Sequence, residues 1–212
     1  MRARWNRFLT YEIWPFAAAV GMSAAVLFLV WNFFHPKPEP ILYVAVFDVT
    51  LPAEEADRMC AALAGENAER ITLDDSFRSD NVKDVERLQV LLYNHDVDAV
   101  IASEEVIRTL AGYGYFQEIT EVLSEDAAEE AFSEGRLFET AGYLDTEEIS
   151  MEDHETGRGE VLPYGLRLAG STRWRELAGE TASGYLAAVI CESEHVEKAS
   201  DLMSWLLDSG DA

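Results

Sequence analysis

The longest apolar run of the chain lies near its N-terminus. No charged residue occurs between Glu12 and Lys37, and Trp14 and Phe34 mark the ends of the apolar stretch. At about 1.5 Å per residue, a helix over 14–34 is long enough to cross a hydrocarbon core of about 30 Å. A cleaved signal peptide is the alternative, but bulky aromatic residues close the run where a cleavage site needs small ones. The pattern therefore predicts an uncleaved transmembrane helix over 14–34.

The charges that flank this run predict its orientation. Arg2, Arg4 and Arg7 precede it, and only Lys37 follows closely. Because positive residues are enriched on the cytoplasmic side, residues 1–13 are expected in the cytoplasm and the chain is expected in the cell membrane, crossing it once. Residues 35–40 (HPKPEP) read as an extended spacer that leads to an extracellular domain over 41–212.

The next part of the chain alternates between strand and helix patterns. Apolar runs at 41–49 and 97–103, with an alternating run ending near Asp74, predict three strands. Helical periodicity fills both intervals, and a further helix is expected to begin after Ser103. This alternation predicts an α/β fold with one doubly wound, mainly parallel sheet.

The second half is less regular. Residues 117–160 contain an acidic helical stretch, a strand near 137–144 and a polar segment, 151–160, that reads as an exposed hairpin tip. Strands are expected again over 161–168 and 185–192, and Ser193 is expected to cap a last amphipathic helix.

Three segments resemble bacterial extracellular solute-binding proteins of the type II periplasmic-binding-protein fold. They read VDAVIASEEVIRTLAGYGYFQEITEVL from Val97, VLPYGLRLAGS from Val161 and YLAAVICESEHVEKASDLMSWLL from Tyr185. The resemblance extends to short, membrane-anchored forms from Gram-positive bacteria. It implies a late strand and helix that pack back on the first lobe. A two-lobed binding protein needs roughly 250 residues or more, so the resemblance is to a single lobe.

The charge of the 41–212 domain restricts its partners. Without residues 1–40, 12 basic residues remain against 38 acidic ones, a formal charge of −26. Such a surface repels phosphate backbones, which excludes nucleic acid as a partner. Solubility is the general interpretation of such a charge, and binding of a cation is the specific one.

Polar residues at the expected carboxyl ends of the strands are the candidates for ligand binding, because doubly wound sheets bind ligands at that edge. A small polar or cationic solute is the expected ligand. Helix capping by Asp75, Asp80 and Ser103 is the structural alternative. The candidate set is Asp48, Asp74, Asp75, Ser103, Glu104 and Tyr164.

No cofactor, metal site or catalytic group is predicted. Asp74, Asp75 and Asp80 supply oxygen ligands but lack the spacing of an EF-hand loop. Cys60 and Cys191 have no metal-ligand or redox spacing; buried free thiols are favoured, with a disulfide left open.

Three functions follow from these patterns. The first is a membrane-anchored, solute-binding-like module linked to a transporter. The second is a degenerate binding-protein lobe that acts as an interaction or structural domain of the cell envelope. The third is an enzyme, which is not expected because no catalytic constellation is readable.

Overall fold

The computed structural model describes residues 13–34, 40–144, 156–179 and 184–207. It divides into two units, Met1–Glu39 and Pro40–Ala212. The expected cytoplasmic segment up to residue 12, most of the 35–40 spacer and half of the expected hairpin tip lie outside the described residues.

The described part of the first unit is the single helix α2 (Ile13–Phe34). Its sequence carries no acidic residue in the first turn and no basic residue in the last. The side chains that the structure describes in α2 run from 16 to 31 and include Phe34. Counting only such residues, no helix is both long enough and apolar enough to cross a membrane.

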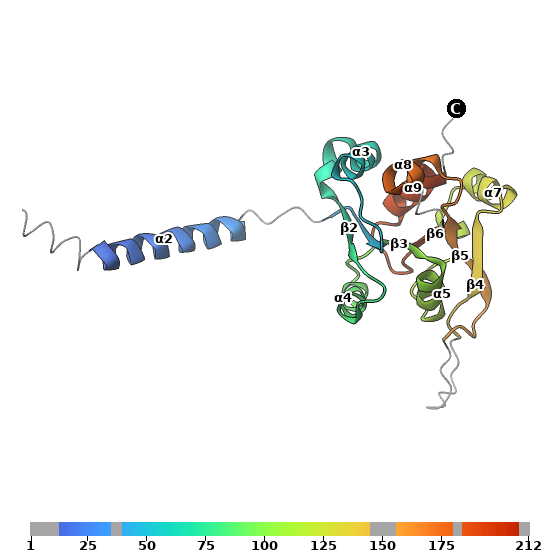
Figure 1. Cartoon of the computed structure of the whole chain (residues 1–212), viewed down its shortest axis with the longest axis horizontal. Coiled ribbons are helices and arrows are strands. Elements are labelled where there is room, and N and C mark those ends of the chain that lie inside the picture. Colours follow the sequence, from blue (N-terminus) through green and yellow to red (C-terminus); the bar gives the residue numbers. More distant parts are fainter. Residues whose placement is uncertain (1–12, 35–39, 145–155, 180–183, 208–212) are drawn as a thin grey trace, which may run out of the picture. The chain divides into compact units, whose positions relative to one another are not determined.

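The second unit is an α/β domain built on one mixed sheet (Figure 1). In the described residues the sheet has six strands in the order β2-β1-β3-β6-β5-β4. The strands are β1 (Leu42–Phe47), β2 (Ile71–Phe77), β3 (Ala99–Ser103), β4 (Leu137–Ala141), β5 (Val161–Arg167) and β6 (Tyr185–Val189). The helices are α3 (Ala53–Ala64), η2 (Gly65–Arg70), α4 (Val82–Tyr93), α5 (Glu104–Gly112), α6 (Ile119–Val122), α7 (Glu125–Ser133), α8 (Thr172–Ala178) and α9 (Val196–Leu207).

The prediction of a mainly parallel sheet is wrong. β1 pairs in parallel with β2 and β3, whereas β3–β6, β6–β5 and β5–β4 are antiparallel pairs. The chain reaches β6 from β5 through α8, and β6 lies between β3 and β5, antiparallel to both. Alternating elements predict the parallel half, but the short apolar run of β6 fits either direction.

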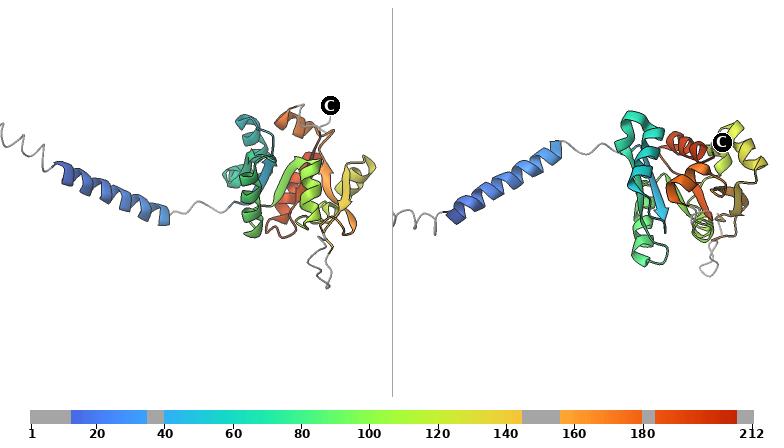
Figure 2. Two further views of the ribbon diagram at one scale, coloured as in Figure 1. Left: turned by 60° about the horizontal axis from the view of Figure 1, so that its bottom comes forward. Right: turned by 45° about the horizontal axis from the view of Figure 1, so that its top comes forward.

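Helices cover both faces of the sheet (Figures 1 and 2). One face of β1, formed by Leu42, Val44 and Val46, belongs to a core shared with α3, α6, α8 and α9. The other face, with Ala45 and Phe47, packs against α4 and α5. β1 is therefore apolar on both sides, as its uninterrupted hydrophobic run predicts for a central strand.

The two cysteines lie in different surroundings and are both free. Cys60 packs against the first core, as expected. Cys191 is exposed, so the prediction of a buried thiol there is wrong. It comes directly after the β6 run, where the chain leaves the sheet. Burial is the main reason that the pKa of each thiol is raised, with Asp57 and Glu192 adding to the effect at Cys60 and Cys191 respectively.

Candidate functional site

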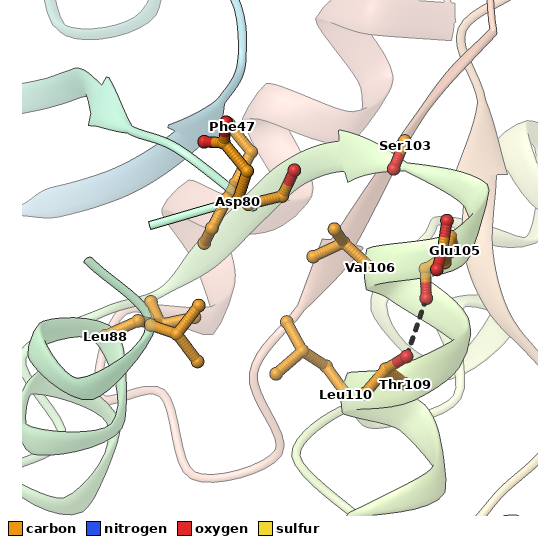
Figure 3. Close-up of a pocket in the computed structure, with 10 residues that line it drawn as sticks. Phe47, Asp80, Leu88, Ser103, Glu105, Val106, Thr109 and Leu110 are labelled. Carbon is orange, nitrogen blue, oxygen red and sulfur yellow. Dashed lines mark hydrogen bonds between the residues drawn. The ribbon is translucent and has the colours of Figure 1, made fainter. Parts of the chain in front are cut away.

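The candidate site is a cavity of about 290 Å³ between α4 and α5, which we call the crevice (Figure 3). It opens where β1 and β3 end, at the carboxyl edge of the sheet. The chain leaves β1 toward α3 on one face and leaves β3 toward α5 on the other. In open α/β sheets, ligands bind at such a switch point. The volume is at the lower end of the range for small-molecule sites.

The inner wall of the crevice is apolar. Leu88 approaches from α4, while Val106 and Leu110 approach from α5 on the opposite side (Figure 3). Phe47 closes the end of β1, and Val85 completes the wall. These positions follow from the helical periodicity of α4 and α5, which places one apolar stripe of each helix over the same face of the sheet. The wall offers contact to the hydrocarbon part of a ligand.

The rim of the crevice is polar and acidic. Asp80 and Glu105 bring two carboxylates to it, and Ser79, Ser103 and Thr109 bring hydroxyl groups. The Thr109 hydroxyl donates to the carbonyl oxygen of Glu105 at 2.8 Å (Figure 3). No lysine, arginine or histidine occurs among the described residues that line the cavity. The rim therefore favours a positively charged or hydrogen-bonding group over an anion.

Asp48 holds part of this rim in place through a hydrogen bond to Ser79. Its backbone is left-handed, with φ of 57°, and its Oδ1 accepts a hydrogen bond from the Ser79 amide at 2.9 Å. The bond fixes the turn after β2, which carries Ser79 and Asp80 over the end of β1. Asp48 is thus a positioning residue, one step removed from the cavity lining.

We expect Asp48→Ala to lower the unfolding free energy by about 1–2 kcal/mol. The substitution removes this hydrogen bond, and it places an alanine, which lacks a polar side chain to bond locally, in the left-handed backbone region. Asp48→Asn keeps an acceptor and tolerates the same backbone, so it is expected to stay within about 0.5 kcal/mol of wild type. Urea unfolding measures both. Equal losses in the two variants would contradict the role assigned to the side chain.

Ser103 and Glu104 lie at the carboxyl end of β3, where the sequence places them: Ser103 is the last residue of the strand and Glu104 the first of α5. Ser103 lines the crevice and occupies the N-cap position of α5, although its side chain makes no capping hydrogen bond. Glu104 turns away and pairs with Arg108 at 2.6 Å and Arg167 at 3.5 Å. The hydrogen bond from Arg108 is the main cause that lowers the pKa of Glu104, and the charges of both arginines contribute.

Asp74 and Asp75 are predicted to follow a strand, but they lie within β2, which continues to Phe77. β2 is an edge strand, where charged residues are tolerated within the strand itself. The Asp74 carboxylate accepts from the Tyr43 hydroxyl at 2.7 Å and pairs with Arg87 at 3.2 Å. Burial raises the pKa of Asp74, but hydrogen bonds from Ser76 and Tyr43 and the Arg87 charge outweigh it and lower the pKa overall.

Asp75 is engaged on the α3 side. Its Oδ2 accepts from the Leu51 amide at 2.8 Å, just before α3 begins. Neither Asp74 nor Asp75 is among the residues that line the crevice. Their roles are structural, and the described residues contain no cluster of three or more metal-ligand side chains.

Tyr164 also lies away from the crevice. It is in the middle of β5, and a Cβ on Gly142 would lie 2.3 Å from its hydroxyl oxygen. Gly142 follows the carboxyl end of β4, which is antiparallel to β5, so this hydroxyl points toward the opposite edge of the sheet. Burial, then Glu118 and Glu160, raise the pKa of Tyr164. The structure therefore does not bring Tyr164 to the crevice.

Sequence reasoning missed most of the lining. The sequence predicts the helices that carry Val85, Leu88 and Glu105, but it gives no reason to bring these residues together. The available signal was that α4 and α5 flank β3 in the chain, so that both pack on one face. No family model, no curated protein and no solved structure matches the chain.

Proposed function

We propose that the chain is a membrane-anchored, extracellular solute-binding-like module that holds a small polar or cationic solute in the crevice. The observation that carries the proposal is the crevice itself, with an apolar wall, two rim carboxylates and a position at the switch point between β1 and β3. The proposal is for binding and not for catalysis.

The anchor in this proposal is α2. Its 22 residues span about 33 Å at 1.5 Å per residue, and its sequence contains no charged residue. Phe16, Leu27 and Phe28 are exposed along it, which in water leaves a large apolar surface uncovered. Arg2, Arg4 and Arg7 before the helix support a cytoplasmic N-terminus.

The topology also supports the likeness to one lobe of a type II periplasmic binding protein. The resemblance implies that a late strand and helix return to the first strands. β6 inserts beside β3, and the buried residues of α9 join the core that covers β1 and α3. This proposal links the module to a transporter or another envelope protein that receives the solute.

The charge of the domain favours a cation in the crevice. The formal charge of −26 over 41–212 raises the local concentration of cationic solutes, and Asp80 and Glu105 face them at the rim. The apolar wall suits the carbon skeleton of the same molecule. A small amine with a hydrocarbon body combines both properties.

A thermal-shift screen of the full-length chain in detergent tests the proposal, with amines, amino acids, sugars and Ca²⁺ as probes. A solute at a hundred times its dissociation constant adds about 2.7 kcal/mol, which corresponds to a rise of roughly 5–10 °C. Val106→Trp fills the crevice and is expected to abolish the shift. Val90→Trp, on the exposed side of α4, is the matched control and is expected to keep it.

Two outcomes contradict solute binding in the crevice. One is a flat screen on a cooperatively unfolding wild type, and the other is a shift that survives in Val106→Trp. The double variant Asp80→Asn, Glu105→Gln distinguishes a cationic solute from a neutral one. It should lower the affinity for a cationic solute about tenfold and leave the affinity for a neutral solute unchanged.

The second candidate is a degenerate lobe that serves as an interaction or structural domain of the envelope. The observation that favours it is the exposure of Val82 and Val90 on α4, where no described segment covers them. A flat screen, together with loss of a protein complex in Val82→Ser, would support this function over the first.

A further inference from the structure

A second cavity, of about 440 Å³, lies at the opposite edge of the sheet. We call it the tyrosine cavity. Three segments that are distant in sequence form it: the end of α4 and the following turn, with Tyr93 and His95, the loop after α5 with Tyr115, and the residues after β6 with Glu192. The crevice shares none of the residues that line it.

Tyr93 is unusual among the aromatic residues of the domain. Its side chain is 85% exposed, although Leu92 beside it is buried. Tyr115, on the facing loop, is partly buried against the second core and is therefore fixed in place. One ring is thus held by the fold and the other stands at the cavity without packing against the core. A ligand that covers the Tyr93 ring would bury aromatic surface that the domain itself leaves exposed.

The remaining described lining contains one carboxylate, Glu192, and one imidazole, His95, but no lysine or arginine. The Glu192 carboxylate lies 3.2 Å from His95 Nδ1 and is itself well exposed. Gln89 adds a neutral amide, and Leu92 and Ile190 add apolar surface. Aromatic faces, one carboxylate and apolar surface together attract a cation that is weakly hydrated.

We propose that the tyrosine cavity binds a quaternary ammonium group, the positive group of choline-like molecules, between Tyr93 and Tyr115 with Glu192 as the counter-charge. A trimethylammonium group has no N–H donor, so it needs ring faces and apolar contact rather than a set of acceptors. A primary ammonium ion needs hydrogen-bond acceptors to replace its water, and this cavity offers few. The proposal does not depend on the function assigned to the crevice.

Isothermal titration of the full-length chain, in a detergent without choline, tests this chemistry. The probes are choline and its neutral tert-butyl isostere, in which a carbon replaces the nitrogen. We expect choline to bind about tenfold more tightly than the isostere, because only the charge differs. A glycerophosphocholine titration distinguishes the two sources of the group: tighter binding than choline indicates a lipid headgroup, and weaker binding indicates a free solute.

Variants locate the site. Tyr93→Ala is expected to weaken choline binding about fivefold, while Tyr93→Phe keeps the ring and stays within about twofold of wild type. Phe132→Ala in α7 is the matched control, because Phe132 is 74% exposed and does not line this cavity; it should leave binding unchanged. Because Tyr93 is so exposed, its loss should not unfold the domain.

Three results would overturn the proposal: equal affinity for choline and the isostere, unchanged choline binding in Tyr93→Ala, or no choline binding by the wild type at millimolar concentration. Val106→Trp separates this site from the crevice, since it should abolish solute binding there and leave choline binding intact. A failure of solute binding in the crevice can therefore be distinguished from a failure of choline binding in the tyrosine cavity.

Discussion

Replacing Arg136 by alanine is expected to lower the unfolding free energy of the domain by about 4 kcal/mol. The Arg136 side chain is buried, and its two terminal nitrogens donate to the carbonyl oxygens of Leu207 at 2.8 Å and Leu206 at 2.9 Å. These carbonyls end α9 and have no partner within the helix. The guanidinium also meets the negative end of the helix dipole, and its Nε donates to the Arg167 carbonyl at 3.2 Å.

The loss should appear as a fall in melting temperature of roughly 10 °C for a domain of this size. Arg136→Lys is expected to recover less than half of it, because one ammonium group cannot reach three carbonyls in the fork geometry of arginine. Arg58→Ala serves as the control, since Arg58 makes only an exposed ion pair with Glu55 and should change stability by less than about 0.5 kcal/mol. A similar melting temperature for Arg136→Ala and Arg58→Ala would refute the capping role.

Asp98→Ala is expected to cost about 3 kcal/mol. This carboxylate is 2% exposed and connects three parts of the fold. It accepts from the Tyr43 amide of β1 at 2.7 Å and from the Ser193 hydroxyl at 2.7 Å, and His195 Nδ1 lies 3.2 Å away. Ser193 and His195 precede α9, so Asp98 joins the start of the last helix to the centre of the sheet.

Chemical denaturation with a double-mutant cycle checks this assignment. Asp98→Asn keeps one acceptor and should cost about half as much as alanine. Ser193→Ala alone should cost about 1 kcal/mol, and little more in the Asp98→Ala background, because the partner is already gone. Asp201→Ala is the exposed control, with an ion pair to Lys198 at 2.7 Å. Strict additivity of the Asp98 and Ser193 losses would contradict the bond between them.

Local patterns predicted the elements of the first half well. The helical periodicity between the second and third predicted strands corresponds to α4, which begins at Val82 with the Asn81 side chain as its cap, and the run 97–103 contains β3. These features depend on neighbours in sequence, which propensity and periodicity report. Ser103 lines the crevice for the same reason, since it ends a strand whose carboxyl end is visible in the sequence.

Features that depend on pairing between distant segments were not predictable. Nothing in Tyr185–Val189 indicates that it lies between β3 and β5 or runs antiparallel to both. The polar pair Asp74–Asp75 resembles the end of a strand in the sequence. Polar residues inside a strand are expected only where the strand lies at the edge of a sheet, and the sequence does not show that β2 is an edge strand. Tyr164 lies away from the crevice for a related reason, since the end of the sheet that a residue of β5 approaches depends on strand pairing.

The central position of β6 has a consequence for how the domain is made. β4 and β5 form a hairpin, and β1, β2 and β3 form a parallel group, but β6 is the strand that joins them. The residues of β6 emerge from the ribosome after those of the other five strands. Until they arrive, β3 and β5 both have open edges, and the sheet consists of two unconnected parts. The chain is therefore expected to close its sheet in one late step, once β6 has been synthesised.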